Sequence, residues 1–84
     1  MTQTFAALFA KIAVGAQGTW RFESPHPADS PAYRSGLELA QREFISAGRA
    51  ARKSAVTIID VHRETDSGES LVDFFQFRKT KTSM

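Results

Sequence analysis

Apolar residues near the start of the chain recur at the spacing of a helix. The large apolar residues between positions 4 and 14 follow the i, i+3, i+4, i+7 pattern of a single helix face. They are Phe5, Leu8, Phe9 and Ile12. Thr2 or Thr4 is suited to cap such a helix, and Gly15 is suited to end it. The pattern predicts a helix over residues 4–14, and the alternative is a strand over residues 11–14 that turns at "GAQG".

A longer periodic stretch begins at Pro31. Ser30 is a good N-cap, and Pro31 stands at the first helical position, where its missing N–H costs nothing. Apolar residues then recur at spacings of four and three, which predicts an amphipathic helix ending near Lys53. They are Tyr33, Leu37, Ala40, Phe44, Ala47 and Ala51. Gly36 and Gly48 each weaken this helix by about 1 kcal/mol relative to alanine, and each is a place for a close backbone contact.

Alternation with a period of two marks the strands. In "GTWRFES", Trp20 and Phe22 point to one side, which predicts a short strand with one buried face. A loop containing three prolines follows it. Residues 56–64 are rich in β-branched side chains, residues 66–68 form a turn signal, and residues 71–78 read as another strand. The spacing of the last three segments predicts a β-hairpin.

The order helix, strand, helix, strand, strand predicts a small α+β domain. We expect a three-stranded antiparallel sheet with β-α-β-β order, with the N-terminal helix and the central amphipathic helix packed on one face. The 84 residues suffice for a single domain over residues 1–84. Residues 79–84 are expected to form a flexible tail.

Composition narrows the chemistry and the setting. The chain has no cysteine, which excludes disulfides, a thiol nucleophile and cysteine-ligated zinc, and which fits a cytoplasmic protein. The apolar stretch near the N-terminus is interrupted by Lys11 and is shorter than the roughly 20 residues of a membrane span. We therefore expect it to belong to the fold, and we expect no membrane partner. With no disulfide to stabilise so small a domain, a homodimer is a further expectation.

Two registers of the predicted hairpin have different chemical consequences. If paired residue numbers sum to 135, His62 faces Asp73 and Asp60 shares their side, a cluster that could orient a general base or bind a metal. If they sum to 136, Arg63 faces Asp73 and four large apolar residues share the other side. These are Ile59, Val61, Phe75 and Phe77. Burial of one such side chain is worth about 1.5–3 kcal/mol and an exposed charge pair about 0–1, so the second register is favoured and the His62–Asp73 site is not expected.

Other polar features give no stronger candidate for catalysis. His26 lies between two prolines, Asp60 and Glu64 are spaced as ordinary strand charges, and Ser67 next to Gly68 has no supporting base. The "GAQG" turn lacks the lysine of a phosphate loop, and the two histidines are too far apart in the sequence to form a metal motif. We therefore expect no enzyme, no catalytic residue, no metal and no cofactor.

Charge is unevenly distributed although the formal net charge is only +2. Residues 42–53 carry a local net charge of +3 and residues 60–73 carry −4. Such patches steer partners, and the cations of the predicted helix are candidate partner-binding residues. They are Arg42, Arg49, Arg52 and Lys53. The same cations, with the basic tail, support nucleic-acid binding as the alternative function.

A second candidate interface is apolar. Phe74 and Phe75 are adjacent in a predicted strand and must point to opposite faces of the sheet. With helices on one face only, an apolar stripe would be left exposed on the other, and such patches usually mark an interface. The expected stripe is Val56, Ile58, Val72 and Phe74, of which Val72 and Phe74 are taken as partner-binding residues. Sheet edges could also pair across an interface.

The chain also resembles a known group of proteins. A strand before a helix, then "VHRETDSGES" and the aromatic strand "LVDFFQFRK", is similar to small phage-encoded anti-CRISPR proteins of the type I class, over roughly residues 18–79. The resemblance implies a non-enzymatic inhibitor that docks on a nucleic-acid-binding complex of the host, and it carries over no functional residue. Many such inhibitors are strongly acidic, and the charge of +2 departs from that pattern. We thus predict a small, non-catalytic protein-binding module.

Overall fold

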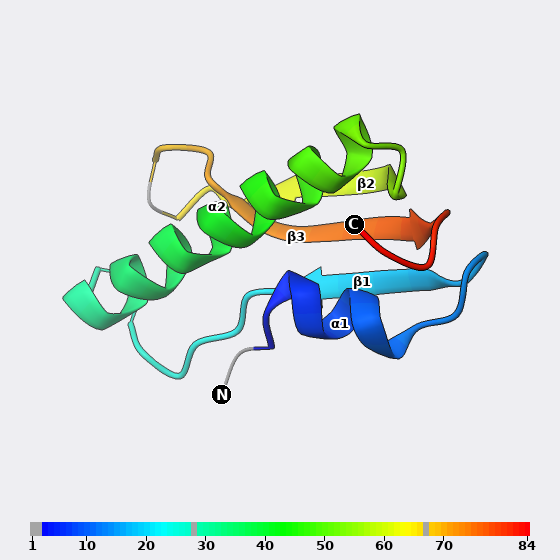
Figure 1. The fold of residues 1–84 in the computed structure, drawn as a ribbon. Helices are drawn as coiled ribbons and strands as arrows, with labels where there is room; N and C mark the ends of the chain where they lie inside the picture. Colours follow the sequence, from blue (N-terminus) through cyan, green and yellow to red (C-terminus); the bar gives the residue numbers. More distant parts are fainter. Residues whose placement is uncertain (1–2, 28, 67) are drawn as a thin grey trace.

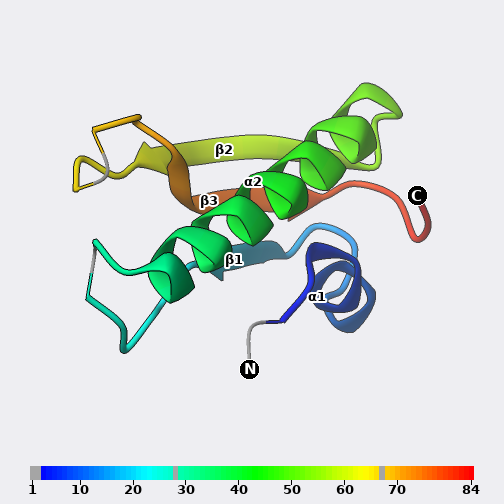
Figure 2. The same ribbon diagram turned by 90° about the vertical axis from the view of Figure 1, so that its left-hand side faces the viewer.

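Two helices cover one face of a three-stranded antiparallel sheet in the computed structural model (Figure 1 and Figure 2). The structure describes residues 3–27, 29–66 and 68–84. The predicted α+β class and its order of elements are confirmed. The elements are α1 (Phe5–Lys11), β1 (Gln17–Arg21), α2 (Pro31–Arg52), β2 (Val56–Arg63) and β3 (Val72–Lys79). The strand order is β1-β3-β2, so β3 lies between the other two strands.

The N-terminal helix α1 is held at both ends by the rest of the fold. At its start, Thr4 Oγ1 accepts a hydrogen bond from the Ala7 N–H, as predicted for the cap. At its end, the Nζ of Lys79 donates to the carbonyl oxygens of Phe9 (2.8 Å) and Ile12 (2.9 Å). A cation suits the C-terminal end of a helix because the last carbonyls there lack partners within the helix. The helix over residues 4–14 is thus confirmed, with shorter bounds.

The long helix α2 starts and ends where its caps predict. Ser30 Oγ accepts from the Tyr33 N–H at 3.2 Å, Pro31 is the first helical residue, and Lys53 is the C-cap. Its buried side is lined mainly by small residues, which lets the helix approach the sheet closely. The buried residues are Leu37, Ala40, Ala47 and Ala50. Within the described residues, neither helix has the length and apolar character needed to cross a membrane.

The core is an aromatic cluster centred on Phe75 of β3, whose side chain is fully buried. The indole ring of Trp20 in β1 is stacked on it at 5.7 Å between centroids, with 8° between the ring planes. Phe44 of α2 and Phe5 of α1 also contact it, at 5.4 Å and 6.2 Å between centroids. One residue therefore joins the sheet to both helices, and each buried aromatic contributes roughly 1.5–3 kcal/mol.

Two polar side chains of α2 also hold the layers together. The side-chain amide of Gln41 donates to the Val72 carbonyl (2.7 Å) and accepts from the Val72 N–H (2.9 Å), so it binds both backbone groups of that residue. The carboxylate of Glu43 accepts from the Phe5 N–H at 2.7 Å, at the N-terminal end of α1. Each of these bonds satisfies a backbone group that would otherwise lose its partner on burial.

The hairpin of β2 and β3 uses both of the registers that the sequence allows. From Val56 to Ile58 the paired residue numbers sum to 135, and from Asp60 to His62 they sum to 136. A register shift between Ile58 and Asp60 separates the two parts, and a second shift follows His62. The prediction of one uniform register is therefore wrong. The irregularity at Ile59 keeps Ile58 and Val61 opposite Phe77 and Phe75 respectively, which a uniform register could not do.

The end of the chain is more ordered than the predicted tail over residues 79–84. Lys79 ends β3 and is buried, with an exposed fraction of 6%. The backbone N–H groups of Thr80 and Lys81 both donate to the carbonyl of Ala55, at 2.8 Å and 3.3 Å. A flexible tail can therefore begin only after Lys81. The predicted turn at residues 66–68 includes Ser67, which lies outside the described residues, whereas Gly68 has a positive φ of 77°.

The two glycines of α2 differ in their surroundings, and this difference can be tested. A Cβ added at Gly36 would lie 2.5 Å from a ring carbon of Phe22, whereas one added at Gly48 would meet no atom within 4 Å. Both substitutions to alanine gain about 1 kcal/mol of helix propensity. Only Gly36→Ala also incurs the cost of overpacking, typically about 1–3 kcal/mol. We expect Gly48→Ala to exceed Gly36→Ala in free energy of unfolding by about that amount in urea denaturation. Equal stabilisation by both substitutions would contradict the close contact with Phe22.

Candidate functional site

The four predicted cations lie together on the outward side of α2, around an exposed isoleucine. Three of them share one helix face with Ile45, because the four positions have the spacing i, i+3, i+7, i+10. These four residues are Arg42, Ile45, Arg49 and Arg52. This face is opposite to the side that packs on the sheet, and all four residues are exposed. The side chain of Lys53, at the C-cap, is exposed next to them. We call these five residues the cationic face of α2.

An exposed aliphatic side chain in the middle of this face is the feature that the sequence prediction missed. Ile45 is 54% exposed, and its helix neighbours three to seven positions away are the arginines of the same face. The signal in the sequence is the helical spacing of Ile45 from the arginines on the outward side of α2. A large apolar residue ringed by arginines resembles the composition of protein interfaces, which are enriched in arginine.

The basic and acidic segments of the sequence lie toward opposite ends of the folded molecule. Lys81 extends the basic end, since its Nζ donates to the carbonyl of Lys53 at 2.9 Å. The turn between β2 and β3 lies at the opposite end, where Glu69 forms an ion pair with Arg34 near the start of α2. A 22-residue helix spans about 33 Å, so these ends are well separated.

The pKa of Tyr33, near the start of α2, is affected by the acidic residues at that end of the molecule. Partial burial raises the pKa of its hydroxyl above the ordinary value. The carboxylates of Asp66, Glu64 and Asp73 add to this effect, because a nearby negative charge disfavours the phenolate. These three carboxylates thus lie near Tyr33, at the start of α2, away from the cationic face of that helix.

Phe74 lies on the face of the sheet that the helices leave uncovered. Its neighbour Phe75 is buried on the helix side, so the two rings point in opposite directions, as predicted. Phe74 is only half-buried, and the guanidinium of Arg21 lies 5.4 Å from the centroid of its ring. This contact is a cation–π pair at an exposed site. The uncovered face therefore presents Phe74 partly shielded by a charged residue.

The predicted apolar stripe on this face is wrong. Val72 is buried with an exposed fraction of 1%, and its backbone is bound by Gln41 from the helix layer. Val56 is also buried, and Ile58 faces Phe77 on the core side. Residues 56–58 pair with β3 in the register that was not favoured, which places Ile58 opposite the buried Phe77. Val72 therefore belongs to the core and offers no side chain to a partner.

His62 and Asp73 meet, although the favoured register excluded their contact. His62 Nδ1 and Asp73 Oδ1 are 2.6 Å apart, with side-chain exposures of 66% and 24%. The second register shift, after His62, leaves Asp73 without a partner in β2 and frees its carboxylate to reach the imidazole. Arg63 pairs with Val72 instead of with Asp73. Asp60 and Phe74 border the same depression, of about 390 Å³.

The His62–Asp73 pair supplies only one part of what a catalytic or metal site needs. Among the described residues, no three histidine, cysteine, aspartate or glutamate side chains converge to hold a metal ion. A carboxylate that orients an imidazole is one half of a catalytic arrangement, which also needs a nucleophile or a bound substrate beside the second ring nitrogen. The His62 side chain is mostly exposed to solvent. We interpret the contact as a hydrogen-bonded pair at the surface.

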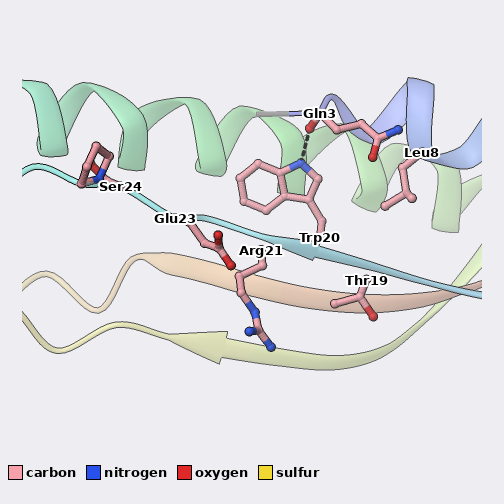
Figure 3. A pocket seen from close by; sticks show the side chains of 8 residues that line it. Gln3, Leu8, Thr19, Trp20, Arg21, Glu23 and Ser24 are labelled. Atoms are coloured by element: carbon pink, nitrogen blue, oxygen red, sulfur yellow. Dashed lines mark hydrogen bonds between the residues drawn. The ribbon is translucent and has the colours of Figure 1, made fainter. Parts of the chain in front are cut away.

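A groove that no sequence motif predicts runs along the free edge of β1. It has a volume of about 680 Å³ and is lined by Thr19, Trp20 and Arg21 of β1 together with Gln3 and Leu8 from the α1 side (Figure 3). The indole Nε1 of Trp20 donates to the Gln3 carbonyl at 2.7 Å, which fixes the wall of the groove. Segments far apart in the sequence form this groove, so no local motif marks it.

The structure thus brings together only part of the predicted partner-binding set. The cations of α2 form one surface, Phe74 lies on the opposite side of the molecule, and Val72 is in the core. Comparison of the chain with protein-family models, with curated proteins and with solved structures finds no match.

The His62–Asp73 contact should contribute little to stability, because both groups are partly exposed. We expect a double-mutant cycle of His62→Ala and Asp73→Ala to give a coupling energy of about 0.2–1 kcal/mol, as for other exposed ion pairs. Urea denaturation of the wild type, the two single variants and the double variant measures this coupling. A coupling above about 2 kcal/mol would contradict the interpretation as a surface pair.

Proposed function

We propose that this protein is a non-catalytic protein-binding module whose main interface is the cationic face of α2. The observation that supports the proposal is the exposure of Ile45 among Arg42, Arg49 and Arg52 on a helix face turned away from the core. Burial of such an apolar residue by a partner stabilises a complex, and the surrounding cations speed association with an acidic surface. The expected partner is therefore a protein with an acidic, partly apolar patch.

Nucleic-acid binding by the same face is the alternative, and it is less well supported. Phosphate contacts need cations but gain nothing from an aliphatic side chain at their centre. The acidic turn between β2 and β3 also repels a long polyanion that extends beyond the helix. Leu39, 41% exposed on the neighbouring side of α2, adds to the apolar character of the surface.

The biological role that we propose is that of a cytoplasmic inhibitor of phage or mobile-element origin, acting on a host complex such as CRISPR-Cas. The support for this role is the resemblance in length and β-α-β-β order to small anti-CRISPR proteins. A cationic interface differs from the acidic surfaces that imitate DNA. Inhibition would therefore proceed by occupying an acidic protein surface of the target and not by replacing its nucleic acid.

Charge reversal on α2 tests the proposed interface. We expect Arg49→Glu combined with Arg52→Glu to abolish capture of a stoichiometric partner from bacterial lysate, because two attractive contacts become repulsive. Mass spectrometry of material bound to the tagged protein measures the capture. Circular dichroism should show an unchanged fold, since both side chains are exposed.

The matched control reverses two arginines elsewhere on the surface. Arg63→Glu combined with Arg78→Glu changes the net charge equally but leaves the cationic face of α2 intact, so it should retain the partner. Equal loss in both double variants would contradict a defined interface.

Ile45→Ser distinguishes protein binding from nucleic-acid binding. It should weaken a protein complex and leave salt-dependent binding of labelled DNA or RNA unchanged. Salt-sensitive nucleic-acid binding tighter than about 100 µM would favour the alternative.

A further inference from the structure

The free edge of β1 presents backbone groups that the described part of the chain leaves unpaired. The Phe22 N–H donates to the Asp73 carbonyl (2.7 Å) and the Lys79 N–H donates to the Ala16 carbonyl (2.9 Å). In an antiparallel ladder, residues bonded to the neighbouring strand alternate with residues whose N–H and C=O point away from it. These two bonds therefore identify the outward-directed residues of β1. They are Gln17, Thr19 and Arg21.

The opposite edge of the sheet is protected, which makes the open edge of β1 distinctive. Two register shifts interrupt β2, and the N–H of Val61 is occupied by the Asp60 carboxylate at 2.9 Å. Bulges and charged side chains of this kind are the usual means by which proteins prevent pairing at a sheet edge. β1 pairs with β3 without a register shift from Gln17 to Arg21. The edge of β1 is therefore regular, and its outward N–H and C=O groups are placed to bind another strand.

The groove described above lies along this same edge. On the helix side, the half-buried Leu8 provides an apolar wall, and Trp20, which is only 2% exposed, lies behind it (Figure 3). On the other side, Arg21 projects away from the indole, and Ser24 lies at the end of the groove farthest from Leu8 (Figure 3). A strand added at this edge would lie about 4.8 Å from β1, inside the groove. Its alternate side chains would face the apolar wall and the guanidinium.

We propose that the edge of β1 binds an extended segment of a partner protein as a fourth strand of the sheet. The backbone groups of Gln17, Thr19 and Arg21 would supply the affinity, and the groove would select an apolar residue next to a polar or acidic one. This surface lies apart from the cationic face of α2, so the inference does not rest on the function proposed above.

A second copy of this chain fits the edge less well than an extended segment. The helix α1 lies alongside β1 toward its free edge (Figure 1 and Figure 2), and its Leu8 lines the groove. Pairing of two β1 strands would place two α1 helices on the same face, over strands only about 4.8 Å apart. Packed helices need about 8–10 Å between their axes. A single strand without a helix avoids this conflict.

Selection of peptides followed by NMR tests the proposal. A library of random heptapeptides displayed on phage is selected against the full chain, and a recovered peptide is synthesised. We expect it to slow hydrogen exchange of the Thr19 and Arg21 amides at least tenfold. The amides of Gly18 and Trp20 should already be protected by β3 in the free protein.

Proline substitution provides an independent test of the backbone contacts. Thr19→Pro removes an outward N–H without removing a bond to β3, and proline is tolerated at such edge positions. Thr19→Val keeps the N–H and serves as the matched control. We expect Thr19→Pro to weaken binding of the peptide at least tenfold, and Thr19→Val to change it less than threefold. Arg49→Glu combined with Arg52→Glu should leave peptide binding unchanged.

Three outcomes would overturn the proposal. The first is that no recovered peptide protects Thr19 and Arg21. The second is that both Thr19 variants bind the peptide equally well. The third is protection of these two amides that rises with protein concentration in the absence of peptide, which would identify a second copy as the occupant. If Thr19→Pro does not fold, hydrogen exchange of the Thr19 and Arg21 amides in the wild-type chain still decides whether the peptide binds at this edge.

Discussion

Burial of Phe75 is the constraint on which the other parts of the structure depend. It lies on the central strand β3, where Trp20 stacks on it from β1 and Phe44 and Phe5 contact it from the two helices. In a domain of 84 residues, only about 60–65% of the surface exposed by the unfolded chain is buried on folding. A few aromatic contacts therefore carry much of the stability, and each element is placed by its access to this ring.

The hairpin is irregular beside the strand that carries this ring. Phe77 is opposite the half-buried Ile58 in one register, and Phe75 is opposite Val61, which is 36% exposed, in the other. The first register shift in β2 separates these two pairings, while both phenylalanine rings of β3 stay buried. After the second shift Val72 is paired with Arg63 and is buried, and Asp73, which has no Cα partner in β2, contacts His62.

Because the helices lie on one face, the molecule has three surfaces of different character. The outward side of α2 is cationic with an exposed Ile45, the uncovered sheet face is mixed in charge around Phe74, and the edge of β1 carries open backbone groups. The buried ammonium of Lys79 joins the end of β3 to the end of α1, which keeps α1 along the groove. The two proposed binding surfaces can thus be altered separately.

Local signals in the sequence determined the elements and much of one surface. The caps at Thr4 and Ser30 and the periodicity of the apolar residues predicted both helices, and helical spacing alone places the arginines of α2 on one face. The register shifts, the His62–Asp73 contact and the groove along β1 were decided only by the tertiary structure. Each depends on contacts among residues that are distant in sequence, which local patterns do not record. The groove likewise exists only because α1, through Gln3 and Lys79, is fixed beside a strand edge that β3 does not cover.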